Sequence, residues 1–191
     1  MTPREHFSGP AVRLFFALWP DETVRAALAG WSAALRQACG GRVTRPGNLH
    51  LTLAFLGDTD AGRLDELKDA AGTVGPRAFE LVIDQPGYWK HNRIAWAGAS
   101  AEPAALTEMV GELRGVLKRA RFRFDAKPFV SHVTLVRKAS PPAELPELAP
   151  IVWSATGFAL VRSVPGPQGS DYAVAGEWRA AGRRGTDGEE V

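Results

Sequence analysis

The chain has 191 residues, of which 45% are hydrophobic and 23% are charged, and its formal net charge at pH 7 is +2. This length suits one large domain or two small lobes that share a core, and the composition predicts a soluble globular protein. No apolar run approaches the roughly 18 residues that a membrane helix needs, so a membrane partner is excluded. The single cysteine, Cys39, excludes an internal disulfide, and the polar residues 1–10 lack a signal leader, so a cytoplasmic location is expected.

The first half of the chain alternates predicted strands with predicted helices. Residues 13–19 are typical of a buried strand, and residues 20–35 of a helix with an acidic first turn. A second strand is predicted over residues 49–56, with a turn at 57–58. The remaining elements of this half are a helix over residues 60–73 and a hairpin of strands 79–83 and 93–97, connected by residues 85–92.

The second half again places a helix before a strand. Its predicted elements are a helix at residues 103–119 and strands at 122–124, 129–137, 152–161 and 172–178, with a loop at 165–169 between the last two. Strands joined by hairpins and mixed with a few helices indicate the α+β class with antiparallel sheets. A single domain is predicted over residues 11–180, and residues 1–10 and 181–191 are expected to be flexible because they lack apolar periodicity.

One tetrapeptide pattern occurs twice, as His50-Leu51-Thr52-Leu53 and as His132-Val133-Thr134-Leu135, 82 positions apart. The chain's own residue frequencies give a probability on the order of 0.001 for two copies by chance. Side chains alternate between the faces of a strand, so each copy presents an imidazole and a hydroxyl on one face and two apolar groups on the other. Because both copies follow a predicted helix, they form a structural pseudo-repeat, and the two motif strands are expected to face each other across a cleft.

Two imidazoles that titrate near neutrality, on opposite sides of a bound phosphate, form a general base and a general acid. Phosphodiester transfer needs this pair, because the nucleophilic oxygen loses a proton while the leaving oxygen gains one. Thr52 and Thr134 are candidate hydrogen-bond donors to the nonbridging oxygens, and Arg137 is a candidate bidentate phosphate ligand. The residues alone, His50 and His132 above all, therefore predict metal-free phosphoryl transfer.

Other interpretations of these residues are weaker. A zinc site would need a Cys or carboxylate near the motifs on the same face, and neither motif has one. Cys39 precedes two glycines at the end of a predicted helix, where a core role is commoner than a nucleophile. The glycine-rich segments match neither the phosphate-binding loop nor the dinucleotide fingerprint. Basic clusters at residues 90–93, 118–123 and 137–138 leave a non-catalytic RNA-binding protein as an alternative of a different class.

The chain resembles the 2H phosphoesterases, in particular the branch of RNA 2',3'-cyclic phosphodiesterases that are also called 2'-5' RNA ligases. The resemblance runs from Arg13 to about Trp178 and rests on the opening strand and on the two motifs in their contexts, residues 48–57 and 132–137. Ser131 departs from the proline that the family often has before the second histidine, which alters the start of that strand but removes no catalytic group.

The resemblance implies a bilobal α+β fold with two pseudo-symmetric lobes, antiparallel sheets facing a central cleft and helices on the outside. It also implies hydrolysis of a 2',3'-cyclic phosphate to a 2'-phosphate without a metal or other cofactor, with His132 activating water and His50 protonating the departing 3'-oxygen. By the same analogy Arg137 holds the phosphate and Phe16 stacks on the nucleobase, although a core position on a buried strand is an equal alternative for Phe16.

The expected partner is RNA or a nucleotide with a 2',3'-cyclic phosphate, and a monomer without an obligate protein partner is the default. The base and acid roles can be exchanged between the two histidines, because the two copies of the motif are nearly symmetric. Ligation through a 2'-5' bond, hydrolysis of another cyclic phosphate and cleavage of a 2'-5' oligonucleotide remain alternatives, since all of them would use the same groups.

Overall fold

The computed structural model describes residues 10–166 and 169–181, so most of the predicted flexible termini and residues 167–168 of the predicted loop lie outside the described residues. Its strands are β1 (Ala11–Leu18), β2 (Arg42–Val43), β3 (Leu51–Asp60), β4 (Phe79–Ile83), β5 (Gln85–Trp89), β6 (Ile94–Gly98), β7 (His132–Arg137), β8 (Ile151–Ala155), β9 (Gly157–Gly166) and β10 (Gly169–Arg179). Its helices are α1 (Glu22–Cys39), α2 (Leu64–Gly72) and α3 (Ala104–Arg119), with short 3-10 turns η1 (Pro46–Asn48) and η2 (Ala61–Arg63). None of these helices is long and apolar enough to span a membrane.

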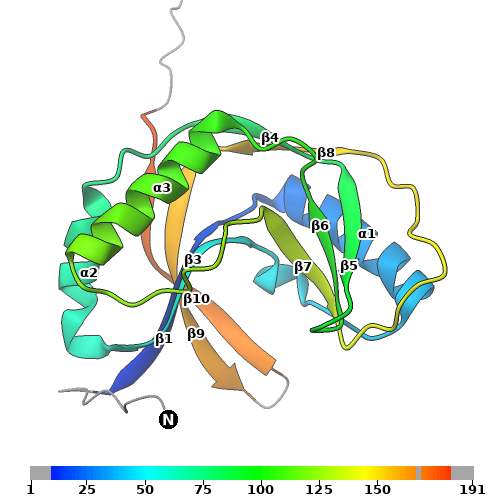
Figure 1. Ribbon diagram of the computed structural model, residues 1–191, viewed down its shortest axis with the longest axis horizontal. Coiled ribbons are helices and arrows are strands. Elements are labelled where there is room, and N and C mark those ends of the chain that lie inside the picture. The colour runs from blue at the N-terminus through cyan, green and yellow to red at the C-terminus, as the bar shows by residue number, and fades with distance from the viewer. Residues whose placement is uncertain (1–9, 167–168, 182–191) are drawn as a thin grey trace, which may run out of the picture.

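Most strands join one antiparallel path in the order β10-β9-β1-β3-β7-β6-β5, with β2 beside β7, while β4 and β8 pair in a separate sheet (Figure 1). The described residues of β3 and β7 meet at one register pair, Leu51 opposite Val133. So short a ladder divides the path into a first lobe, β10-β9-β1-β3, and a second lobe, β7-β6-β5 with β2. The predicted α+β fold with two lobes of antiparallel sheet is confirmed.

The helices are exchanged between the lobes. Helix α1 follows β1 in the sequence but packs against β6 and β7 of the second lobe, while α3 precedes β7 but packs against β3 of the first lobe and against α2. Figure 1 shows α2 and α3 together on one side of the molecule and α1 on the other. Each motif strand is therefore supported by a helix from the opposite half of the chain.

Local sequence explains the bounds of α1. The carboxylate of Asp21 accepts a hydrogen bond of 2.8 Å from the backbone N–H of Val24, and Glu22 places a negative charge at the positive end of the helix dipole. Gly40 ends the helix with φ of +61°, a conformation that glycine adopts without strain. Its buried apolar side chains recur at helical spacing and form the stripe that packs on the second lobe: Val24, Leu28, Trp31, Leu35 and Cys39.

The predicted hairpin of residues 79–83 and 93–97 is wrong, because each strand has another partner. Strand β4 pairs with β8, and β6 pairs with β5, which occupies most of the segment expected to be a connection. Pro86 and Gly87 in this segment are residues that seldom occur inside a strand. In the structure the ring of Trp96 lies where a side chain on residue 87 would be, so glycine at this position lets the two strands pair.

Three other boundaries differ from the sequence-based expectation. The predicted turn at residues 57–58 lies inside β3, where Gly57 has φ of +72° next to a β-bulge. The predicted strand at residues 152–161 is divided at Thr156, which lies between β8 and β9, and Gly157, the first residue of β9, has φ of +153°. Residues 122–124 form no strand.

Candidate active site

A cleft with a volume of about 870 Å³ is lined from both sides of the junction between β3 and β7. The sequence-predicted residues that line it are His50, Thr52, His132, Thr134 and Arg137. The apolar partners in the motifs point the other way, into the core, where Leu51, Leu53, Val133 and Leu135 are each at most 1% exposed. The alternation expected within each tetrapeptide therefore holds in the structure.

Both motif strands carry a β-bulge at the fourth residue of the motif. Phe16 and Ala17 of β1 are consecutive, but their partners on β3 are Ala54 and Thr52, so Leu53 is the extra residue. On the other strand, Ala95 and Trp96 of β6 face Val136 and Thr134, so Leu135 is the extra residue. The two copies thus share a backbone irregularity as well as a sequence.

Each bulge changes which face the following residue occupies. Leu135 and Val136 are consecutive, yet both are fully buried, and Arg137 consequently lies on the cleft side with His132 and Thr134. In a regular strand Arg137, five positions after His132, would point to the opposite face. The bulge is the reason that this arginine reaches the cleft.

The two imidazoles are held by the same backbone contact. Nδ1 of His50 lies 2.7 Å from the carbonyl oxygen of Asn48, and Nδ1 of His132 lies 2.8 Å from that of Val130, in each case two residues earlier. A carbonyl oxygen only accepts, so each Nδ1 carries the proton and donates it. The lone pair of a neutral ring is then on Nε2 in both histidines.

The two Nε2 atoms differ in their surroundings. Nε2 of His50 lies 3.1 Å from Oγ1 of Thr52, so the neutral imidazole accepts a hydrogen bond from the threonine hydroxyl. For Nε2 of His132 the structure records no hydrogen-bond partner among the residues it describes. His132 is also the less deeply buried of the two.

Aromatic rings surround His50 more completely than His132. The ring centroid of Phe15 lies 4.6 Å from that of His50, Tyr172 approaches edge-on at 5.3 Å, and Trp19 is stacked at 6.0 Å. Among the described residues, His132 has one such neighbour, the edge-on ring of Trp89 at 4.6 Å.

This difference appears in the proton affinities of the two histidines. Burial lowers the pKa of His50 to about 4, against the opposing hydrogen bond to Asn48, and the nearby charges of Arg137 and His132 lower it further. Burial, followed by the charge of Arg137, also lowers the pKa of His132. Both imidazoles are therefore neutral at pH 7 when the cleft holds no anion.

Arginines supply most of the charge in the cleft. Arg13, Arg42, Arg45 and Arg137 all line it, and Arg45 forms an ion pair of 2.7 Å with Asp171. The structure records no hydrogen bond or ion pair for the Arg137 side chain within the described residues. An arginine fork of this kind matches the oxygens of a phosphate.

Sequence reasoning missed three of these arginines. Arg13, Arg42 and Arg45 come from β1, β2 and the segment before η1, and only the strand order brings them beside the motifs. Of the basic clusters noted in the sequence, the one at residues 137–138 reaches the cleft through Arg137. The clusters at residues 90–93 and 118–123 do not line it.

The prediction that Phe16 stacks on a nucleobase is wrong, and the alternative, a core position, is the one that the structure shows. The side chain of Phe16 is fully buried in the core, where its ring centroid lies 6.0 Å from that of Phe158 and 5.9 Å from that of Trp178. The neighbouring residue, Phe15, lines the cleft instead, but it is 2% exposed because its ring lies against that of His50. Alternation along β1, applied from Arg13, would have identified this face.

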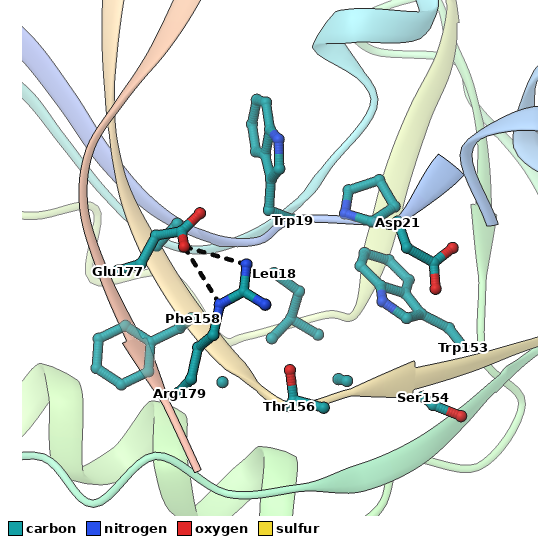
Figure 2. A pocket seen from close by; sticks show the side chains of 13 residues that line it. Leu18, Trp19, Asp21, Trp153, Ser154, Thr156, Phe158, Glu177 and Arg179 are labelled. Atoms are coloured by element: carbon teal, nitrogen blue, oxygen red, sulfur yellow. Dashed lines mark hydrogen bonds and ion pairs between the residues drawn. The ribbon is translucent and has the colours of Figure 1, made fainter. Parts of the chain in front are cut away.

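A smaller cavity of about 270 Å³ lies beside the end of β1 and contains neither motif. Figure 2 shows the Glu177 and Arg179 ion pair at its edge, and the Trp19 side chain pointing away from Arg179 and Thr156. The ring of Trp19 instead stacks on His50.

A metal site and a cysteine nucleophile are the other chemical possibilities that the sequence raises. The described part of the chain holds no cluster of three or more His, Cys, Asp or Glu side chains suited to a metal ion. Cys39 is the last residue of α1, its thiol donates to the carbonyl oxygen of Leu35, and burial raises the pKa of the thiol. A neutral, buried thiol of this kind is a poor nucleophile.

Comparison with known proteins places these features in a family. The sequence model of the family described as LigT like Phosphoesterase matches residues 18–96. An Escherichia coli protein named RNA 2',3'-cyclic phosphodiesterase is 34% identical over 134 residues, which cover 70% of this chain and 76% of the relative. A Thermus thermophilus protein of the same name is 33% identical over 195 aligned positions, covering 92% and 94%. The crystal structure of E. coli LigT complexed with 3'-AMP superposes with a TM-score of 0.80 at 30% identity, covering 91% of this chain and all of that one.

Proposed function

Because the chain belongs to the family of LigT-like phosphoesterases, we propose that it is an RNA 2',3'-cyclic phosphodiesterase that hydrolyses a cyclic phosphate end to a 2'-phosphate. The observation that carries this proposal is the pair of His-x-Thr motifs that line one cleft from two lobes, each with its Nε2 lone pair fixed by an Nδ1 hydrogen bond to the backbone.

The reaction divides between the two histidines. Nε2 of His132 takes a proton from a water molecule as the water oxygen forms a bond to phosphorus. The bond from phosphorus to the 3'-oxygen breaks, and the proton on Nε2 of His50 passes to that oxygen. The product carries a 2'-phosphate and a 3'-hydroxyl, and exchange with solvent returns His132 to the neutral form and His50 to the protonated form.

The assignment of base and acid follows the different surroundings of the rings. His132 suits the base, because its Nε2 has no recorded partner in the described structure and the ring is less buried, so a water molecule can reach it. His50 suits the acid only when the phosphate is bound, since its pKa of about 4 keeps it neutral in the free protein. The phosphate anion raises that pKa because it stabilises the imidazolium.

Three further side chains bind the phosphate in this proposal. The hydroxyls of Thr52 and Thr134 donate to its nonbridging oxygens, and Thr52 exchanges its hydrogen bond to His50 for one to the phosphate. The guanidinium of Arg137 adds a charged, bidentate contact. None of these groups changes its own protonation state during the reaction.

The direct test is hydrolysis of adenosine 2',3'-cyclic phosphate by the purified protein in the presence of a chelator. We expect multiple turnovers that yield the 2'-phosphate. Formation of the 3'-phosphate, or dependence on an added divalent metal, would contradict the proposal. Stoichiometric binding of a cyclic-phosphate RNA without turnover would favour the RNA-binding alternative.

We further propose that the protein acts as a monomer in the cytoplasm. One chain supplies both histidines, both threonines and Arg137 to the cleft, so no second copy is needed to complete the site. Light scattering is expected to give the mass of one chain, 20.6 kDa. A stable dimer at enzyme-assay concentration would contradict the monomer.

A further inference from the structure

The two bulges give the motifs a third equivalent position that faces the cleft. This position is five residues after the motif histidine, and it is Arg137 on β7 and Phe55 on β3. Leu53 and Ala54 are both buried, as Leu135 and Val136 are, and Phe55 then returns to the cleft side opposite Phe15 of β1. Phe55 is thus the structural counterpart of the phosphate-binding arginine, but its side chain is a flat apolar ring.

The antiparallel register places these two residues at opposite ends of the cleft. Strands β3 and β7 run in opposite directions from the pair formed by Leu51 and Val133, so Phe55 lies beyond Thr52 and Arg137 lies beyond Thr134. The Arg137 end also contains Arg42, its register partner on β2. One end is therefore rich in positive charge, and the other presents an aromatic ring.

Phe55 is unusually exposed for a side chain of its size and is firmly supported. It is 38% exposed, whereas Phe15 beside it on β1 is 2% exposed. Its backbone carbonyl accepts a hydrogen bond of 2.8 Å from the N–H of Asp125, which ties this part of β3 to the segment after α3. The backbone that carries the ring is thus tied in place, and the ring itself is left partly exposed at the cleft, although burial would stabilise it.

Arg13 completes the surface. Its guanidinium carbon lies 5.4 Å from the centroid of the Phe55 ring, within the range of a cation-π contact, and its Nε lies 4.0 Å from a carboxylate oxygen of Asp58. Asp58 is the register partner of Arg13 across the strands. The guanidinium thus lies against the ring with Asp58 beside it, and the two planar groups form one surface, hereafter the Arg13–Phe55 ledge.

From this geometry we infer that the Arg13–Phe55 ledge binds the base of the nucleotide that precedes the one with the cyclic phosphate. The inference rests on the proposed function. Aromatic rings and guanidinium planes are the groups on which unpaired RNA bases stack, with little dependence on the base. Thr52 and Phe55 are about 7 to 10 Å apart along the strand, a distance that one nucleotide step can span. The substrate class is therefore an RNA chain of at least two nucleotides rather than a mononucleotide.

The test compares kcat/KM for the dinucleotide ApA with a terminal 2',3'-cyclic phosphate against kcat/KM for adenosine 2',3'-cyclic phosphate. The wild-type protein is expected to favour the dinucleotide, and Phe55→Ala to lower the ratio of the two values about 10-fold, since stacking on one aromatic ring contributes a factor of this order. Phe55→Trp retains a ring and should retain the preference. The matched control is Val82→Ala on β4, a side chain with the same 38% exposure outside the cleft, which should leave the ratio unchanged.

Two results would overturn the ledge while leaving the proposed function intact. One is a wild-type protein that hydrolyses both substrates equally well. The other is a Phe55→Ala variant that loses activity on both substrates to the same extent, which would indicate a structural role for the ring. If neither substrate is hydrolysed, the proposed function fails, and the ledge is then tested by calorimetry with ApA 2'-phosphate and adenosine 2'-phosphate. The same 10-fold change in the ratio of Kd values supports it, and an unchanged ratio contradicts it.

Discussion

The two motif strands have the same sequence pattern, the same backbone contact at Nδ1 and the same bulge, yet they build unequal halves of the cleft. On the β3 side, His50 is enclosed by three aromatic rings and hydrogen-bonded to Thr52. On the β7 side, His132 has one aromatic neighbour and no recorded partner at Nε2 within the described structure. In the proposed mechanism, the shared features place the two imidazoles on either side of one phosphate, and the unequal features assign one ring as base and the other as acid.

The largest expected effect comes from removing either imidazole. His50→Ala and His132→Ala are each expected to lower kcat/KM for a cyclic-phosphate substrate by about 10²- to 10⁴-fold, because each removes a proton-transfer group. His91→Ala is the matched control, since His91 lies outside the cleft and should retain activity. Loss of only twofold for either motif variant would show that the two-histidine mechanism is wrong.

The threonines should rank next, and unequally. Thr134→Val removes one donor to the phosphate and is expected to lower kcat by about 100-fold. Thr52→Val also removes a donor, but it removes as well the hydrogen bond that Nε2 of His50 accepts in the free protein, which favours the neutral ring, so its loss should be the smaller. Steady-state kinetics on both variants, with circular dichroism to check folding, tests the order. Equal losses would indicate that the contact between Thr52 and His50 is incidental.

These features also show how far the sequence could be interpreted. The alternation of faces within four residues predicted where the motif side chains point, because it needs only local backbone geometry. The bulges at Leu53 and Leu135 could not be predicted, since they depend on pairing with β1 and β6. Arg137 is predicted from its place near the end of the motif strand and from the family resemblance, without its direction, and no local pattern identifies Phe55.

Other errors have the same origin in long-range pairing. The family resemblance suggested Phe16 for the nucleobase, and only the two faces of the strand distinguish this buried residue from Phe15, which lines the cleft. The exchange of α1 and α3 between lobes likewise has no local signal, because each helix has an ordinary amphipathic pattern.

The pH dependence of kcat/KM tests the lowered pKa values of the two buried imidazoles. Both pKa values lie below the ordinary value of 6.5 in the free protein, with that of His50 at about 4. Above 6.5 the base is already neutral, while each further pH unit lowers the protonated fraction of the acid about 10-fold. We therefore expect kcat/KM to fall about 10-fold per unit as the pH rises above 6.5. A plateau from pH 6.5 to 8.5 would contradict the lowered pKa values.

The smallest expected effect comes from removing an aromatic ring that lies beside one of the two histidines. Trp19→Ala exposes one face of His50 to water, and Trp89→Ala exposes the edge of His132 that Trp89 contacts, so each should raise the pKa of its own histidine toward the ordinary value. NMR titration of the imidazole protons in the free protein measures both values. If the pKa of His50 in the unmodified protein equals or exceeds that of His132, the more complete aromatic enclosure of His50 does not lower its pKa, which would contradict the proposed difference between the β3 and β7 sides of the cleft.

The most direct test of the central claim, that His132 is the base and His50 the acid, uses a substrate in which sulfur replaces the departing 3'-oxygen. A thiolate leaves without being protonated, so it makes the general acid unnecessary but leaves the need for a base. The account predicts that His50→Ala recovers most of its lost kcat/KM on this substrate and that His132→Ala does not. Recovery by His132→Ala alone would exchange the two roles, and recovery by neither variant would contradict acid catalysis by the motif histidines.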